Sequence, residues 1–235
     1  MADPELAAAL AEVRARLAAA ARRAGRDPGE VALCAVSKTQ PAAAIRAAYA
    51  AGQRLFAENY AQELRDKAAE LADLADLTWH FIGPLQRNKV KYVVGTAALL
   101  QSVDSVRLMD ELDHRAAALG LTLPCLVEVN IAGEASKSGL PPAALPEVLD
   151  AFAARPRLSC EGLMTMPPFG DEAEEARPYF RALRELRDRA AVTPRPRVSL
   201  RHLSMGMSQD FEVAIEEGAT IVRVGTAIFG ARPRP

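Results

Sequence analysis

Eight short apolar runs that alternate with helical patterns restrict the possible folds of this chain more than any other feature. The runs cover residues 31–36, 54–57, 78–82, 99–102, 125–130, 158–164, 198–203 and 221–224. Helical patterns follow the first seven runs, at 41–51, 60–74, 87–95, 105–119, 142–154, 171–191 and 208–217, and another precedes them at 4–25. Alternating strands and helices form parallel sheets with right-handed crossovers. Eight units in 235 residues suit a closed barrel better than an open sheet. We therefore predict an α/β fold, a (β/α)8 TIM barrel with one extra N-terminal helix, as one domain over residues 1–235.

Charge and composition exclude several classes of protein. Lys plus Arg is 29 and Asp plus Glu is 30, which leaves no positive excess for nucleic acid. The first 22 residues are amphipathic and do not have the pattern of a signal peptide, and no segment has the ~18 consecutive apolar residues of a membrane span. Cys34, Cys125 and Cys160 fall in apolar runs without clustered spacing, so we expect free buried thiols. These patterns predict a cytoplasmic protein without nucleic acid or membrane partners, and we expect it to be a monomer.

Lys38 ends the first apolar run and is the residue most suggestive of chemistry. The chain has five lysines against 24 arginines, so its surface charge is mostly arginine. A desolvated lysine can act as a neutral nucleophile and form a Schiff base, whereas arginine stays charged. A lysine that merely ends a strand and reaches water fits the position equally well. Because the reactive groups of such barrels gather at the carboxyl ends of the strands, the other strand ends decide between these readings.

Polar residues follow several other strands. Asn59 follows the second strand, where it could bond a ligand or cap the helix at 60–74. His80 lies inside the third strand and suits a hydrogen-bonded core histidine better than a catalytic base. Lys137 follows the fifth strand and should lie on the same face of the barrel as Lys38, although a solvated loop lysine is the simpler interpretation.

The seventh and eighth strand ends carry the small polar residues of a phosphate site. Leu203-Ser-Met-Gly-Met-Ser208 precedes a helix, and Val222-Arg-Val-Gly-Thr226 ends the last strand. Loops after strands seven and eight, with a helix N-terminus, commonly bind phosphate in these barrels. Arg223 shares the inward side of its strand with Gly225, where it could pair with a phosphate or a heteroaromatic nitrogen. A Schiff-base lysine opposite a phosphate cradle fits pyridoxal 5′-phosphate, which needs both.

Six segments support that cofactor further: Ala35-Val-Ser-Lys-Thr39, Phe56-Ala-Glu-Asn-Tyr60, His80-Phe-Ile-Gly-Pro-Leu-Gln-Arg-Asn-Lys89, Gly162-Leu-Met-Thr-Met166, Leu203-Ser-Met-Gly-Met-Ser208 and Arg223-Val-Gly-Thr-Ala-Ile-Phe-Gly230. Together and in this order they resemble the pyridoxal phosphate homeostasis protein family, whose members are single-domain barrels similar to the N-terminal domain of alanine racemases. The resemblance covers essentially the whole chain. One departure is Ala57, where the family usually has glycine.

The resemblance implies roles for individual residues. Lys38 would carry the cofactor as an internal aldimine, and Asn59 would lie near its ring. Arg223 would face the pyridine nitrogen; because arginine cannot accept a proton, the ring would be a weak electron sink, which argues against transamination. Lys137 is a candidate for cofactor exchange with Lys38. The phosphate would be held, partly through backbone amides, by Ser204, Met205, Gly206, Ser208, Gly225 and Thr226.

The expected function is therefore intracellular homeostasis of the cofactor, meaning its storage, buffering and delivery, without dedicated catalytic activity. Apo pyridoxal-phosphate enzymes would be the acceptors. Racemases take their second base from an additional β-domain, and this chain stops at Pro235. One alternative is a weak amino-acid racemase or another pyridoxal-phosphate enzyme that uses Lys38 with His80 or Lys137. Another is an aldolase-type barrel in which Lys38 attacks a phosphorylated sugar.

Overall fold

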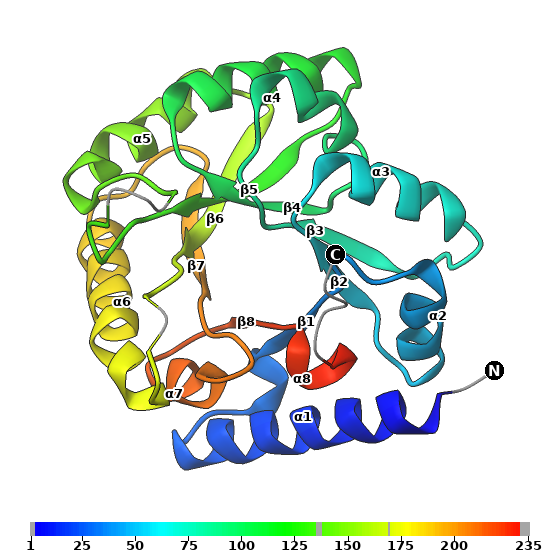
Figure 1. Ribbon diagram of the computed structural model, residues 1–235. Helices are drawn as coiled ribbons and strands as arrows, with labels where there is room; N and C mark the ends of the chain where they lie inside the picture. Colours follow the sequence, from blue (N-terminus) through cyan, green and yellow to red (C-terminus); the bar gives the residue numbers. More distant parts are fainter. Residues whose placement is uncertain (1–2, 135–137, 169, 231–235) are drawn as a thin grey trace.

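Eight parallel strands close into a barrel in the computed structural model, which describes residues 3–134, 138–168 and 170–230. The strands follow sequence order around the barrel, and β8 pairs with β1 to close it (Figure 1). This confirms the predicted (β/α)8 TIM barrel. The strands are β1 Ala32–Val36, β2 Leu55–Glu58, β3 Thr78–Phe81, β4 Leu99–Val103, β5 Leu123–Glu128, β6 Leu158–Met164, β7 Val198–Ser204 and β8 Ile221–Val224.

The outer layer is helical but less regular than the sequence predicts. Its α-helices are α1 Pro4–Arg23, α2 Ala42–Ala50, α3 Ala61–Glu70, α4 Val106–Ala118, α5 Leu145–Ala151, α6 Arg177–Ala191, α7 Phe211–Glu216 and α8 Thr226–Phe229. Short 3₁₀ helices lie at Pro28–Glu30, Arg87–Tyr92, Pro142–Ala144, Phe152–Ala154 and Ala173–Ala176. No helix within the described ranges is long and apolar enough to cross a bilayer.

Several helix predictions need correction. The helix expected at 171–191 is α-helical only from Arg177, after the 3₁₀ helix Ala173–Ala176. The helix expected at 87–95 is the 3₁₀ helix Arg87–Tyr92, and the one expected at 208–217 begins only at Phe211. There the Asp210 carboxylate accepts from the Met207 backbone N–H at 2.6 Å, which holds the preceding residues in a turn. The eighth strand is followed by a helix after all, the four-residue α8. Apolar periodicity does not distinguish these short tight turns from α-helix.

The extra N-terminal helix α1 completes the outer layer where α8 is too short to do so. Asp3 caps α1 by accepting from the Glu5 and Leu6 backbone N–H groups. Its apolar face is buried through Leu6, Leu10, Val13, Leu17, Ala20 and Ala21. In Figure 1, α1 runs along the side of the barrel beside α7, α8 and α2. Since a four-residue helix covers about 6 Å of a strand, α1 buries the apolar surface that α8 leaves open.

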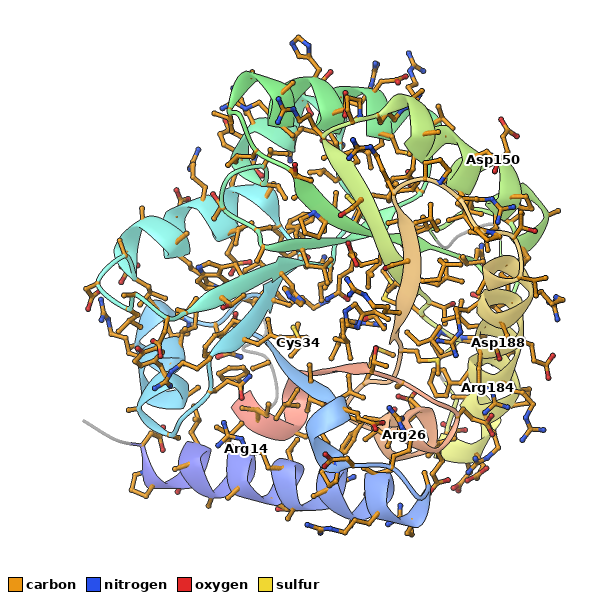
Figure 2. All side chains as sticks on the ribbon, turned by 180° about the vertical axis from the view of Figure 1, so that it is seen from behind. Arg14, Arg26, Cys34, Asp150, Arg184 and Asp188 are labelled. Atoms are coloured by element: carbon orange, nitrogen blue, oxygen red, sulfur yellow. The ribbon has the colours of Figure 1, made fainter. Side chains whose placement is uncertain are left out.

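The barrel interior is apolar at one level and polar at the next. Its apolar cluster comprises Cys34, Ala57, Ile82, Leu99, Leu126, Met164 and Ile221. Figure 2 shows side chains filling the barrel, with Cys34 on β1 among them. All three cysteines are free and buried, as predicted. The polar level contains Gln101, Ser204 and Arg223, whose hydrogen bonds are described with the site.

Candidate functional site

A cavity of about 290 Å³ lies at the carboxyl ends of the strands and brings six of the predicted site residues together. Its remaining walls come mainly from the loop between β6 and α6, including Met166 and Pro168, and from the segment before α7. The six predicted residues that line it are Lys38, Asn59, Ser208, Arg223, Gly225 and Thr226. The residues come from four separate strand ends, so only closure of the barrel places them around one space.

Lys38 lines the cavity because strand β1 alternates its side chains. Cys34 lies inside the barrel and Val36 packs against the same interior cluster, so Lys38 continues the inward side just past the strand end. The lysine is half-buried, with Val36, Ile82 and Met166 as apolar neighbours in the cavity lining. The sequence left a choice between a reactive lysine and one that snorkels to water. The structure places Lys38 in the cavity wall.

Arg223 forms the floor of the cavity and is only 3% exposed. Its guanidinium donates to the Ser204 hydroxyl at 2.6 Å and to the Thr165 carbonyl at 2.9 Å. Burial lowers the pKa of the guanidinium, while Cys34, Glu128 and Asp210 act in the opposite direction. Arginine keeps its proton in proteins, so Arg223 brings a fixed cationic donor to the site.

A chain of hydrogen bonds leads from Arg223 across the barrel to His80. The Ser204 hydroxyl donates to the Gln101 side-chain oxygen at 2.6 Å, and the Gln101 amide nitrogen lies 2.7 Å from His80 Nδ1. Because the Gln101 amide nitrogen can only donate, His80 Nδ1 accepts and its proton sits on Nε2. Burial, and then the charge of His202, lower the pKa of His80 to about 4, so the ring is neutral near pH 7. His80 lies outside the cavity lining, which agrees with the core-histidine interpretation.

The predicted phosphate cradle consists of the Ser208 hydroxyl and the backbone amides that follow β8. Ser208 Oγ accepts from the N–H groups of Gly225 and Ala227, both at 3.3 Å. A hydroxyl oxygen thus occupies the position where an anionic oxygen would find two converging donors. At Gly225 a Cβ atom would come within 3.3 Å of the Val36 carbonyl, so glycine lets β8 and β1 approach closely here.

Ser204, Met205 and Gly206 support the cradle without lining the cavity. Ser204 lies beneath it in the hydrogen-bond chain, and Met205 is packed in the main core. Gly206 has φ 93°, and a Cβ there would come within 2.5 Å of Ala214 Cβ and 2.9 Å of Phe211 Cα. Glycine is therefore needed so that α7 can pack under the loop. These three residues therefore lie outside the cavity lining. Strand alternation alone did not predict this.

Another group of residues near Lys38 was not predicted from the sequence. Lys67 on α3 is buried at 6% exposure, beside the fully buried Glu58 at the end of β2. Lys67 is one of only five lysines, and it falls on the apolar face of its helix with Leu64. The only indication of this group in the sequence was a lysine, a rare residue in this chain, at a helical position expected to be buried. Lys137 lies outside the described residues, and its role in exchange stays a prediction.

The chemistry of the donor set fits a ligand that carries an aldehyde, a ring nitrogen and a phosphate. An amine from Lys38, the guanidinium of Arg223, and hydroxyl and amide donors around Gly225 line the same cavity. Phosphate oxygens accept from amide and hydroxyl donors, and a ring nitrogen accepts from a guanidinium. Within the described ranges, no group of three or more His, Cys, Asp or Glu side chains could hold a metal ion.

Comparison with known proteins points to one family. Residues 9–233 match the family model described as alanine racemase, N-terminal domain. A relative from Aquifex aeolicus, named pyridoxal phosphate homeostasis protein, is 48% identical over 223 residues, covering 95% of this chain and 96% of its own. A relative of the same name from Pseudomonas aeruginosa is 49% identical over 224 residues, covering 95% and 94%. Among solved structures, PipY of Synechococcus elongatus with PLP bound has a TM-score of 0.84 and 40% identity, and the match covers 96% of this chain and all of PipY.

Proposed function

We propose that this chain, which belongs to the pyridoxal phosphate homeostasis protein family, binds pyridoxal 5′-phosphate reversibly through Lys38 and passes it to other proteins. The observation that carries the proposal is the shared cavity of Lys38 and the Ser208–Gly225 cradle. The relatives' names and the PLP-bound PipY structure support the choice of ligand.

Each part of the cavity would hold one part of the ligand. When bound, pyridoxal 5′-phosphate supplies an aldehyde that condenses with an amine to a Schiff base, with loss of water. Lys38 supplies that amine, and its half-buried position limits the hydration that would compete with the reaction. The amides of Gly225 and Ala227, with the hydroxyls of Ser208 and Thr226, would hold the phosphate.

Arg223 would set the protonation state of the bound ring's nitrogen. Its guanidinium would donate to the ring nitrogen and keep that nitrogen unprotonated, because arginine neither releases nor accepts a proton at neutral pH. Ser204 and the Thr165 carbonyl fix the guanidinium from below, at 2.6 and 2.9 Å. Asn59, which lines the cavity from the end of β2, would border the ring. A ring with a poorly protonated nitrogen stabilises carbanions weakly, which suits a carrier better than a transaminase.

The test uses the purified full chain with pyridoxal 5′-phosphate. We expect a visible absorption band that borohydride reduction makes permanent, with the reduced adduct found on Lys38 by peptide mass spectrometry. Lys38→Ala should lose the adduct while it keeps weak noncovalent binding through the cradle. Lys89→Ala is the matched control, because Lys89 also follows a strand end but does not line the cavity. An adduct found mainly on another lysine would refute the assignment of Lys38.

Delivery is tested separately from binding. The loaded protein is mixed with an apo pyridoxal-phosphate enzyme, and recovery of that enzyme's activity is followed against the same concentration of free cofactor. Delivery predicts that activity returns as the absorption of the loaded protein falls. Racemisation of free amino acids by the loaded protein, at rates typical of enzymes, would instead favour the racemase function.

A further inference from the structure

Lys38 sits in a turn whose backbone is strained. The Ser37 carbonyl accepts from the Gln40 backbone N–H at 3.0 Å, so residues 37–40 form a turn with Lys38 and Thr39 at its centre. Thr39 has φ 65°, in the left-handed region. Turns of this kind favour glycine or asparagine at that position, and a β-branched residue there is unusual. Such a conformation persists only where the surroundings hold it.

Three charged side chains from β2 and α3 hold this turn on both sides of Lys38. Lys67 Nζ donates to the Ser37 carbonyl at 2.6 Å, and Glu58 Oε1 accepts from the Ser37 hydroxyl at 2.7 Å. On the other side, Glu63 Oε1 accepts from the Thr39 backbone N–H at 2.7 Å. The residues before and after Lys38 are therefore both fixed by charge-assisted hydrogen bonds, which are the stronger kind.

The three side chains act as one unit, named here the lysine-turn cluster: Glu58, Glu63 and Lys67. Lys67 Nζ lies 2.8 Å from Glu58 Oε1 and 2.9 Å from Glu63 Oε1. Glu58 is fully buried, and its Oε2 atom has no hydrogen-bond partner among the described residues. None of the three lines the cavity. They occupy the layer between the strands and α3, behind the turn.

A buried ionic cluster of this kind is a poor way to gain stability. Removing charges from water costs several kcal/mol per ion, and packed apolar side chains of similar size are often as stable. The cluster's three bonds to the turn are the specific contribution that apolar side chains would not reproduce.

We propose that Lys67, together with Glu58 and Glu63, is a positioning residue for Lys38. The lysine-turn cluster fixes the Ser37 and Thr39 backbone so that the Lys38 amine is aimed into the cavity. This inference rests on the proposed function, in which the Lys38 nitrogen bonds to the aldehyde carbon. In that step both amine hydrogens leave with the aldehyde oxygen as water. Misplacement of the nitrogen by about 1 Å slows such a reaction on the order of 100-fold, which makes its positioning measurable.

Glu63 provides the sharpest test because its bond to Thr39 is exposed and its loss should not unfold the protein. Glu63→Gln keeps an oxygen that accepts from the Thr39 N–H, whereas Glu63→Ala removes it. We expect Glu63→Ala to load pyridoxal 5′-phosphate on the order of tenfold more slowly, and Glu63→Gln to stay within about twofold of the unmodified protein. The rate of rise of the visible absorption measures loading, and the thermal midpoint measures stability. Equal loading rates in the two variants would overturn the proposal.

Lys67 is tested against a buried carboxylate elsewhere in the outer layer. Lys67→Met keeps the apolar stem and removes the ammonium, and Lys67→Arg restores a cation. Glu217→Gln, between α6 and α7, removes a buried carboxylate that pairs with three partly exposed arginines and does not contact the turn. Positioning predicts slower loading in Lys67→Met, partial recovery in Lys67→Arg, and unchanged loading in Glu217→Gln despite its lower thermal midpoint.

The outcomes separate this inference from the proposed function. If the unmodified protein forms no adduct on Lys38, the proposed function fails and the positioning role fails with it. If it loads normally and Lys67→Met loads as fast as Glu217→Gln, only the positioning role is refuted. Slow loading of Lys67→Met with an unaltered circular dichroism spectrum supports it.

Discussion

Glu58 and Glu217 are both buried carboxylates, yet their surroundings differ. Glu58 ends strand β2 and pairs with Lys67. Glu217 follows α7 and is contacted by Arg177, Arg181 and Arg184, at 3.2, 3.0 and 3.1 Å. The labelled Arg184 lies on α6 in Figure 2. One carboxylate thus belongs to a cluster that holds the lysine turn, and the other joins two helices outside the site.

The difference appears in the two pKa values. Burial raises the pKa of Glu58 to about 7, because the opposing effects of Lys67 and the Ser37 hydroxyl do not cancel the loss of water. Burial also acts to raise the pKa of Glu217, but hydrogen bonds from Arg181 and Arg177 and the charge of Arg184 outweigh it and lower the pKa. Three cations fix the charge of Glu217, whereas one lysine leaves Glu58 able to titrate near neutral pH. Barrels commonly place function at the carboxyl ends of their strands and stability elsewhere, and these two clusters fit that division.

Lys67→Met should have the largest effect on stability. It leaves Glu58 buried without a cation, and we expect the free energy of unfolding at pH 8 to fall by about 3 kcal/mol. The loss should be smaller at pH 6, since Glu58 can then take up a proton and become neutral. Urea unfolding at both pH values, followed by circular dichroism, measures the two losses. A loss of the same size at pH 6 and pH 8 would contradict the assigned coupling of Lys67 to Glu58.

Glu217→Gln should have a smaller effect without that pH dependence. The three arginines are partly exposed, so water can replace much of their lost interaction, and we expect a loss of about 2 kcal/mol. Because the pKa of Glu217 is lowered, the loss should be equal at pH 6 and pH 8. The same urea experiment serves here. A difference between the two pH values would show that the contrast with Glu58 is wrong.

Glu58→Gln isolates the titration of Glu58. A carboxyl whose pKa is raised on folding stabilises the protein below its unfolded pKa, and this contribution is lost as pH rises through the folded pKa, here about 7. Between pH 6 and pH 8 the unmodified protein should therefore lose about 1 kcal/mol relative to Glu58→Gln. Subtracting the unfolding free energy of Glu58→Gln from that of the unmodified protein removes the titration of Glu128 and the histidines, which the two proteins share. A difference that does not change with pH would place the pKa of Glu58 outside this range.

Thr39→Gly should have the smallest effect on stability. Glycine adopts φ 65° without strain, but it also increases the freedom of the unfolded chain, so the two changes nearly cancel, within about 0.5 kcal/mol. The more flexible turn should still aim Lys38 less well and slow cofactor loading. Thermal unfolding and the absorption assay measure these separately. A marked rise in stability together with faster loading would show that the threonine strain opposes positioning.

Much of the fold was accessible from the sequence. Alternation of apolar runs and helical patterns predicted the closed barrel, and the strands at Leu158–Met164 and Ile221–Val224 have the predicted bounds. Strand ends of a parallel barrel meet at one face, so Lys38 and Arg223 were expected in one site, and both line the cavity. The alternation of strands and helices and the positions of the strand ends can both be read from short segments of sequence, and each has a fixed geometrical consequence in a closed barrel. The exchange role of Lys137 remains a prediction.

Contacts between distant segments were decided only by the tertiary structure. Gln101 and Ser204 are 103 positions apart, and Lys67 reaches the carbonyl of Ser37 across 30. Helical periodicity placed Lys67 on a buried face but did not say which strand that face would meet. The choice depends on how α3 packs against the strand ends, because an ammonium group bonds only to acceptors within about 3 Å. The sequence by itself determined which strand ends meet at the mouth of the barrel. The packing of α3 decided which side chains fix the backbone beside Lys38.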